Sequence, residues 1–431
     1  MMNKQVKYHI IVPIIVFVLS AFLLIFKVVL LPLVSGMSHV NKFTIRMGED
    51  IVVAQADGKE KLEWGYFQFP RLSYGKQGEI LLKIANKPDA YTDYQGKYLY
   101  YRSFDGGETW HECSAEDYHP RDTKMGNGRF FEGAVHRNAL EKDMNYKSAS
   151  YVFEEKQFAV WHAENGTDNS FDCIEYDEEG GFNNVFESTL NMPWPSIIED
   201  KGVVLPEGIG LYHYANHNPN IIINEEDGNL FLAYFNFGFD ENGVVPYGRH
   251  YNIYFFRSSD SARTWEYVSQ ITTTKKICPD DKEGLCEPTL LIAPDGRYVC
   301  LMRTNSDSPG YISYSIDKGS TWTEPQLFDK VGVDPQMITL GCGVTIASYG
   351  RPGIFLRATD DPECIQWKKP VNLHVGGKTL EEAWNSSCCY TSLIPIDDYN
   401  ALIAFSDFQY PSQDGNGVTK TILVKKINVE Y

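Results

Sequence analysis

The chain has 431 residues, and its 57 acidic against 39 basic side chains give a formal net charge of -18. This acidic balance excludes a general nucleic-acid binder, which needs a broad basic face. With 43% hydrophobic and 22% charged residues the chain is not disordered, and its nine cysteines include no CxxC pair. We therefore expect no zinc site, no other metal and no cofactor.

An uncharged, largely apolar run covers residues 10–26, and after Lys27 it resumes from 28 to 34. About 20 such residues span the hydrocarbon core of a bilayer, so the run is long enough for a transmembrane helix. Lys4 and Lys7 precede the run, and basic residues favour the cytoplasmic side. The run therefore predicts an uncleaved signal anchor.

The anchor predicts three parts of the chain. We expect a cytoplasmic tip and transmembrane helix at 1–36, a linker and lead-in strand at 37–60, and one folded body at 61–431. The body would lie outside the cytoplasm, held by a single pass at the cell membrane. A cleaved signal peptide, which would make the protein secreted, and a buried core helix are the alternatives.

An eight-residue turn recurs in the body, with Ser, Asp, Thr and Trp at constant spacing. Its copies are Ser103–Trp110, Ser258–Trp265 and Ser315–Trp322, and a worn fourth lies at Thr359–Trp367. Asp accepts hydrogen bonds from nearby backbone N–H groups, Gly permits positive φ, and Thr and Trp begin the next strand. Alternating aromatic and apolar residues before each turn are typical of strands.

Four short strands per unit, repeated along the chain, predict an all-β fold. We expect a six-bladed β-propeller preceded by one N-terminal transmembrane helix. A pair of β-sandwiches is the alternative. The predicted blades lie near 66–112, 128–180, 219–268, 287–326, 335–370 and 389–431.

The recurring turns resemble the Asp boxes, or BNR repeats, of the sialidase (neuraminidase) superfamily of six-bladed propellers. The resemblance covers most of residues 60–431. It implies that the turns themselves are structural, because propellers without catalytic activity carry them too. The functional expectation therefore depends on other residues.

The family holds the carboxylate of its substrate with three arginines. Arg351, followed by a proline, is similar to the third of these, and Arg303, at the end of a predicted strand, looks like the second. The first family arginine stands two residues before a proline, where this chain has Gln68, and Arg71 follows Pro70 instead. Residues three apart on a strand point to opposite faces unless a bulge intervenes. The resemblance implies a substrate-binding set of Arg71, Arg303 and Arg351.

Three further residues match the catalytic positions of the family. Tyr390, within the segment Cys389-Tyr390-Thr391-Ser392-Leu393, resembles the catalytic tyrosine, and Glu287 in Cys286-Glu287-Pro288 resembles its base. Asp93 occupies the usual place of the general acid/base. A tyrosine is neutral until its base removes the proton, so it avoids repulsion by a carboxylate on the anomeric carbon. Arginine forks bind such a carboxylate with two hydrogen bonds.

The resemblance implies a membrane-anchored exo-glycosidase that hydrolyses terminal sialic acid, or a related acidic sugar, with retention of configuration. Its expected partners are acidic glycans and the membrane, without nucleic acid. Gln68 in place of an arginine leaves open a hydrolase or lyase of the same fold that acts on uronic-acid polysaccharides. A glycan-binding propeller without turnover is the third alternative.

Overall fold

The computed structural model describes the chain from residue 42 to residue 431. The predicted membrane segment at 1–36 lies outside the described residues. Among the residues that are described, no helix is long and apolar enough to cross a membrane. The positions between 42 and 431 without a description are 58–62, 88–96, 136–145, 154–155, 164–169, 178, 180–181, 192–219, 225–227, 238, 241–242, 245–250, 274–276, 278–284, 307, 378, 414 and 416.

Strands dominate the described residues, so the all-β prediction is confirmed. Most strands form six units of four antiparallel strands. Units 1 to 3 consist of β3 (Tyr66–Tyr74), β4 (Ile80–Asn86), β5 (Lys97–Ser103) and β6 (His111–Cys113); β7 (Thr123–Lys124), β8 (Phe130–Val135), β11 (Ser170–Tyr176) and β12 (Phe182–Asn191); and β13 (Asn220–Asn224), β14 (Asn229–Phe237), β17 (Tyr251–Ser258) and β18 (Thr264–Thr273). Units 4 to 6 consist of β19 (Cys286–Ile292), β20 (Tyr298–Arg303), β21 (Gly310–Ser315) and β22 (Gln326–Asp329); β23 (Val333–Thr339), β24 (Thr345–Gly350), β25 (Ile354–Thr359) and β26 (Val371–His374); and β27 (Thr391–Pro395), β28 (Asn400–Pro411), β29 (Val418–Glu430) and β1 (Thr44–Met47).

A few elements lie outside this scheme. Units 2 and 3 are joined into one sheet, because β12 and β18 pair in parallel with Leu190 opposite Trp265. In the described part of the chain, two short 3-10 helices follow strands of unit 1, and an α-helix precedes unit 6. These elements and two separate hairpins are η3 (Lys76–Gly78), η4 (Ala115–Asp117), α5 (Leu380–Ser386), β9 (Tyr146–Phe153) with β10 (Lys156–Ala163), and β15 (Phe239–Asp240) with β16 (Gly243–Val244).

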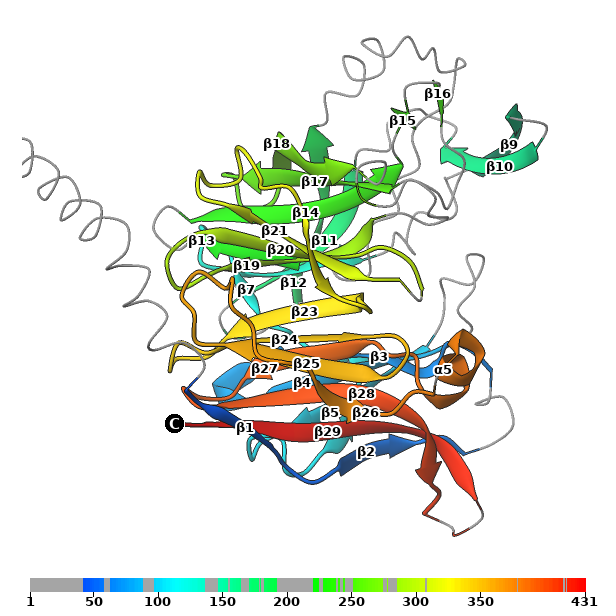
Figure 1. Cartoon of the computed structure of the whole chain (residues 1–431), viewed down its shortest axis with the longest axis vertical. Helices are drawn as coiled ribbons and strands as arrows, with labels where there is room; N and C mark the ends of the chain where they lie inside the picture. Colours follow the sequence, from blue (N-terminus) through cyan, green and yellow to red (C-terminus); the bar gives the residue numbers. More distant parts are fainter. Residues whose placement is uncertain are drawn as a thin grey trace, which may run out of the picture.

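Unit 6 combines strands from the two ends of the described chain. β1 pairs with β29, with Thr44 opposite Glu430, and β2 (Ile51–Gln55) pairs with the same strand farther along. Figure 1 shows the blue strands β1 and β2 beside the red β29. The predicted lead-in segment at 37–60 therefore supplies strands of the last sheet. This pairing satisfies backbone groups that β29 would otherwise leave unpaired at an edge.

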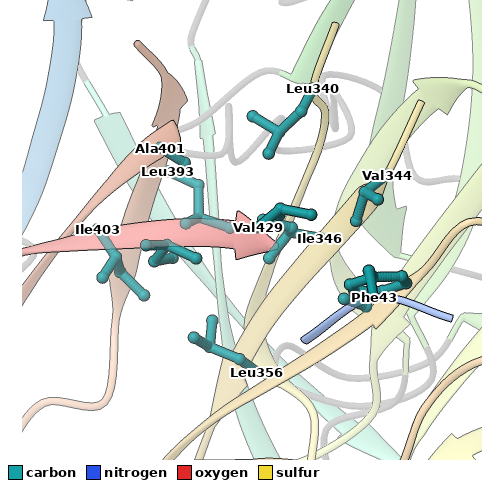
Figure 2. Packing of buried hydrophobic residues seen from close by; sticks show 11 residues of the cluster. Phe43, Leu340, Val344, Ile346, Leu356, Leu393, Ala401, Ile403 and Val429 are labelled. Carbon is teal, nitrogen blue, oxygen red and sulfur yellow. The ribbon is translucent and has the colours of Figure 1, made fainter. Parts of the chain in front are cut away.

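The apolar core lies between neighbouring units. Figure 2 shows the cluster between units 5 and 6, where Ile346 and Leu356 pack with Leu393, Ile403 and Phe43. Similar clusters join units 3 and 4, units 4 and 5, and units 6 and 1. Every residue of β20 and of β24 is buried, as expected for strands covered on both faces.

The first strands of successive units also contact one another. Such contacts join β13 to β19, β19 to β23, β23 to β27, and β27 to β3. Four-stranded sheets that stack face to face, each with its first strand innermost, are consistent with a β-propeller.

The Asp boxes connect the third and fourth strands of units 1, 3, 4 and 5. In unit 4, Asp317 accepts hydrogen bonds from the N–H and the hydroxyl of Thr321 at 2.8 and 2.6 Å, and the Ser315 hydroxyl donates to it at 2.8 Å. The same contacts surround Asp105 and Asp260. Hydrogen bonds from Thr321 hold the pKa of the Asp317 carboxyl below its ordinary value.

The worn fourth turn is an Asp box with one extra residue. Asp361 accepts the N–H groups of Ile365 and Gln366 at 3.1 and 2.9 Å. The indole of Trp367 donates to the carbonyl of Cys364 at 2.6 Å, as the indole of Trp322 donates within its own box. The aspartate tolerates the insertion because it binds backbone N–H groups, which any residue type supplies.

Two of the Asp-box tryptophans also donate a hydrogen bond to the unit that precedes their own. Trp322 of unit 4 donates to the Ser269 hydroxyl in β18 at 3.1 Å. Trp265 of unit 3 donates to the Ser188 hydroxyl in β12 at 2.7 Å. A local turn motif therefore stabilises the stacking of sheets.

Gly319 provides a test of this contact between units. Its φ is +82°, and a Cβ added there would lie 2.2 Å from Cε1 of Phe255 in β17. Gly296 has a φ of +89° with open space around it, so alanine there meets only the backbone cost. We expect Gly319→Ala to lower the free energy of unfolding by about 1–3 kcal/mol more than Gly296→Ala does. Denaturant unfolding of both variants measures the difference, and equal destabilisation would contradict the packing.

Candidate active site

Four of the predicted site residues lie at one edge of units 4, 5 and 6. Glu287 is the second residue of β19 and Arg303 is the last residue of β20, where Cys286 pairs with Arg303. Arg351 directly follows β24, and Tyr390 directly precedes β27. In an antiparallel meander the start of the first strand and the end of the second share one edge. The contacts of β19 with β23 and of β23 with β27 then bring the four residues together.

Tyr390, Glu287 and Arg303 form one connected group. The Tyr390 hydroxyl donates a hydrogen bond to Oε1 of Glu287. Arg303 Nη1 lies 2.7 Å from the same carboxylate oxygen and 3.1 Å from the Tyr390 oxygen. The side chains of Arg303 and Glu287 are only 9% and 13% exposed, so little water screens the ion pair.

The surroundings of Glu287 and Tyr390 shift the pKa values of these two groups in opposite directions. Burial alone would raise the pKa of the Glu287 carboxyl, but the charge and hydrogen bonds of Arg303, with the hydrogen bond from Tyr390, hold it below its ordinary value. Burial raises the pKa of the Tyr390 phenol well above its ordinary value, and the charge of Glu287 raises it further. At neutral pH Glu287 is therefore a carboxylate that accepts a hydrogen bond from the neutral phenol of Tyr390.

Glu287 sits on a distorted strand. Its φ is +42°, which is rare for a residue other than glycine, and Pro288 follows it. The pairing of β19 with β20 shifts register between Cys286 and Thr289. A bulge of this kind re-aims a side chain, and such strained positions cluster at functional sites.

Arg351 is 4% exposed and lies beside the pair. Its Nη2 donates to the carbonyl of Cys388 at 2.6 Å, and its guanidinium lies 5.7 Å from the ring centre of Trp64. Its buried Nε has no hydrogen-bond partner among the described residues. The fork is therefore fixed on one side by the carbonyl of Cys388.

An aromatic wall borders the site. The ring of Phe69 meets the ring of Tyr390 edge to face, with centres 4.8 Å apart. The ring centre of Trp64 lies 6.5 Å from that of Phe69, 6.5 Å from that of Trp384 and 6.3 Å from that of Phe408. Such contacts restrict the rings that surround the Tyr390 hydroxyl and lower the local dielectric constant.

The first strand of unit 1 carries the unusual arginine position. The pairing of β3 with β4 shifts register between Gln68 and Arg71, and Phe69 has a φ of +52°, so a bulge lies at Pro70. Gln68 is completely buried, and neither its amide nitrogen nor its amide oxygen has a partner among the described residues. Arg71 is half-buried and stands opposite Lys83. The role of Arg71 in binding stays a prediction.

The predicted acid Asp93 lies outside the described residues, which omit 88–96. The cysteines near the site are free thiols, as are all eight cysteines in the described part of the chain. Burial raises the pKa of the Cys389 thiol to about 11. This thiol is therefore a filler of the core and not a nucleophile.

Sequence reasoning missed one buried acid of this site. Asp334 is the second residue of β23 and is 4% exposed. Its backbone N–H donates to Oε2 of Glu287 at 3.1 Å. The signal was present in the sequence, because Asp334-Pro335 repeats the acid-proline pair Glu287-Pro288 at the start of the next unit's first strand.

Comparison with known families agrees with the Asp-box geometry. Residues 204–402 match the family model of the BNR repeat-like domain. This part of the chain is therefore similar to a BNR repeat-like domain. Among curated protein sequences no significant match is found.

Solved structures resemble this chain over most of its length. A protein of unknown function from Dyadobacter fermentans is 16% identical, with 90% of this chain and 99% of that chain covered and a TM-score of 0.59. The NanB sialidase from Streptococcus pneumoniae is 15% identical, with 87% and 70% covered and a TM-score of 0.50. The leech intramolecular trans-sialidase is 14% identical, with 88% and 70% covered and a TM-score of 0.50. At these identities the likeness shows the fold.

The ion pair of Arg303 and Glu287 leads to a prediction about the stability of the folded protein. Arg303→Met would leave the Glu287 carboxylate buried without its counter-ion, which typically costs about 3–5 kcal/mol. The pKa of Glu287 would rise, so the loss should be larger at about pH 8 than at about pH 5, where the carboxyl takes up a proton. Denaturant unfolding at both pH values measures it.

A double variant serves as the control. Adding Glu287→Gln to Arg303→Met removes the unpaired charge and should recover part of the lost free energy of unfolding. A loss that is independent of pH and of Glu287→Gln would show that the pair is not ionised in the folded protein.

Proposed function

We propose that this protein is a glycoside hydrolase of the sialidase type, which removes terminal sialic acid or a related acidic sugar with retention of configuration. The observation that carries the proposal is the hydrogen bond from Tyr390 to Glu287 beside Arg303. The proposal takes the six four-stranded units as the blades of a six-bladed propeller. It keeps the membrane anchor expected at 1–36, with the body outside the cytoplasm.

In the first step the Tyr390 oxygen bonds to the anomeric carbon while its proton moves to Oε1 of Glu287. The bond from the anomeric carbon to the leaving oxygen breaks, and that oxygen takes a proton from the general acid, the role predicted for Asp93. In the second step water attacks the anomeric carbon and gives a proton to the same acid. The bond to Tyr390 breaks, and Glu287 returns the phenolic proton. Two inversions retain the configuration.

The charge of the site favours this route. A carboxylate nucleophile would meet the substrate carboxylate with a repulsion of about 4 kcal/mol at 4 Å and an effective dielectric constant of 20. Tyr390 stays neutral because its pKa is raised, and its proton already lies in a hydrogen bond to the accepting oxygen. Proton transfer can therefore accompany the attack and need not precede it.

Two guanidinium groups support binding of an anion here. Arg303 and Arg351 are both buried at the edge where Tyr390 lies. Arg351 retains an Nε donor without a partner among the described residues. In a chain of net charge -18, local positive charge is what would hold a sugar carboxylate.

Tyr390→Phe tests the nucleophile. It removes the attacking oxygen and keeps the ring against Phe69, so we expect kcat on a fluorogenic sialoside to fall at least about 10³-fold. Tyr314→Phe is a matched control, because its buried hydroxyl donates to the Cys364 carbonyl between units 4 and 5. Unchanged turnover by Tyr390→Phe would sink the assignment.

Gln68 favours a second candidate, a hydrolase or lyase for uronic-acid polysaccharides. Its buried amide, without a partner among the described residues, stands where the family has an arginine, so the carboxylate pocket is built differently. From the leading proposal we expect no ultraviolet-absorbing unsaturated product from a panel of uronate polymers. Formation of that product would establish the lyase form of the second candidate, and new reducing ends from the same polymers without that product would establish the hydrolase form. Calorimetric binding of a glycan without either product would point to a binding module.

A further inference from the structure

Asp334 is a second acid beside the proposed nucleophile. It belongs to β23 in unit 5, whereas Glu287 belongs to unit 4 and Tyr390 precedes unit 6. It is 4% exposed. An acid this deeply buried requires partners, and its partners come from both neighbouring units.

Asp334 contacts Glu287 directly and the residue that follows Tyr390. Its backbone N–H donates to Oε2 of Glu287 at 3.1 Å, on the oxygen that Tyr390 does not use. Its side-chain Oδ2 accepts the N–H of Thr391, the residue after Tyr390, at 3.3 Å. One residue therefore holds the carboxylate on one side and the tyrosine backbone on the other.

The local backbone explains how one residue reaches both. Asp334 has a φ of +44°, nearly the same as the +42° of Glu287, and a proline follows each. The pairing of β23 with β24 shifts register between Val333 and Gln336, as β19 does at Glu287. In such a bulge the extra residue leaves the strand ladder, which frees its N–H for Glu287.

The charged and titratable groups that face Asp334 are Glu287 from β19, Arg303 from β20 and Tyr390 before β27. Burial raises the pKa of the Asp334 carboxyl well above its ordinary value, and the charge of Glu287 raises it further. Glu287 has the closer contact with Arg303 and keeps the negative charge. The surroundings of the two acids therefore favour the negative charge on Glu287 and the proton on Asp334.

We propose that Asp334 is a positioning residue that fixes Glu287 and Tyr390 relative to each other. Its side chain orients the backbone at Thr391, and its N–H leaves Oε1 of Glu287 as the oxygen that receives the phenolic proton. The effect of this positioning on catalysis rests on the proposed function. The contacts of Asp334 with Glu287 and Thr391 are independent of it.

The kinetic test compares two variants that both suit a positive φ. Asp334→Asn keeps an acceptor for the Thr391 N–H and stays uncharged, so we expect kcat within about threefold of wild type and an unchanged pH profile. Asp334→Gly removes the acceptor without backbone strain, so we expect kcat on the sialoside to fall about 10- to 100-fold with little change in KM.

Asp361→Asn is the matched control for loss of a buried acid. Asp361 belongs to the same unit and is 7% exposed, but it lies in the Asp box at the opposite edge, since Thr345 pairs with Thr359 and Gly350 with Ile354. We expect reduced thermal stability and unchanged kcat. A folded Asp334→Gly variant with wild-type kcat, or an Asp334→Asn variant as impaired as Asp334→Gly, would overturn the positioning role.

A second measurement needs no substrate. An acid whose pKa is raised in the folded state contributes stability at low pH and loses it as pH rises above the pKa of the unfolded chain, which is about 3.9. Asparagine has no carboxyl group that titrates, so the Asp334→Asn variant does not lose stability in this way. The Tm of Asp334→Asn relative to wild type should therefore increase as the pH rises above about 4, and it should become constant once Asp334 of the folded wild type has ionised.

The two measurements separate the two proposals. If wild type turns over no glycoside but the Tm difference grows with pH, the proposed function fails and the neutral Asp334 stands. If turnover is normal but the Tm difference is constant, Asp334 is ionised and the assignment of the proton to it is wrong, while the kinetic variants still decide the positioning role.

Discussion

The buried negative charge of Glu287 is the constraint from which the rest of the site follows. A buried carboxylate costs several kcal/mol unless charge and hydrogen bonds compensate it. Here Arg303 supplies the charge, while the Tyr390 hydroxyl and the Asp334 N–H supply hydrogen bonds. These donors come from units 4, 5 and 6, so the carboxylate is compensated only when three sheets stand in the correct relation. The site therefore forms only when the three sheets have stacked.

The apolar surroundings strengthen the same interaction. Phe69 covers the Tyr390 ring, and Trp64 links that ring system to Arg351. Excluding water makes each hydrogen bond to Glu287 stronger, and it also makes a missing partner more costly. The paired bulges at Glu287 and Asp334 show how the backbone meets this demand, because residues outside the strand ladder can point where the sheets converge.

Features set by short stretches of sequence were predictable. The Asp boxes depend on hydrogen bonds within eight residues, so Asp105, Asp260 and Asp317 could be recognised without knowledge of the fold. The all-β class followed from strand patterns and turns. Glu287 and Tyr390 were found through family resemblance, and each motif is local as well.

Features that depend on other units were not predictable. The charge state of Asp334 is set by Glu287, 47 residues earlier in the chain, and by burial between sheets. The contact of Trp64 with Arg351 spans 287 residues, and nothing in either segment indicates it. The strand at 44–47 was expected only as a lead-in. Its pairing could not be predicted, because its partner, β29, begins at residue 418. Periodicity identifies a strand and does not identify its neighbour.

That last pairing also has a temporal side. Ribosomes deliver the chain from its N-terminus, so β1 exists for the whole of synthesis before β29 follows it. Until then the first strand has an open edge, and units 1 and 6 lack the apolar cluster that joins them. A nascent chain that has already emerged past Glu287 and Asp334 therefore still lacks the strand that completes the sheet of unit 6. Until β29 emerges, β1 has no partner along its edge, and such an exposed strand can pair with other chains.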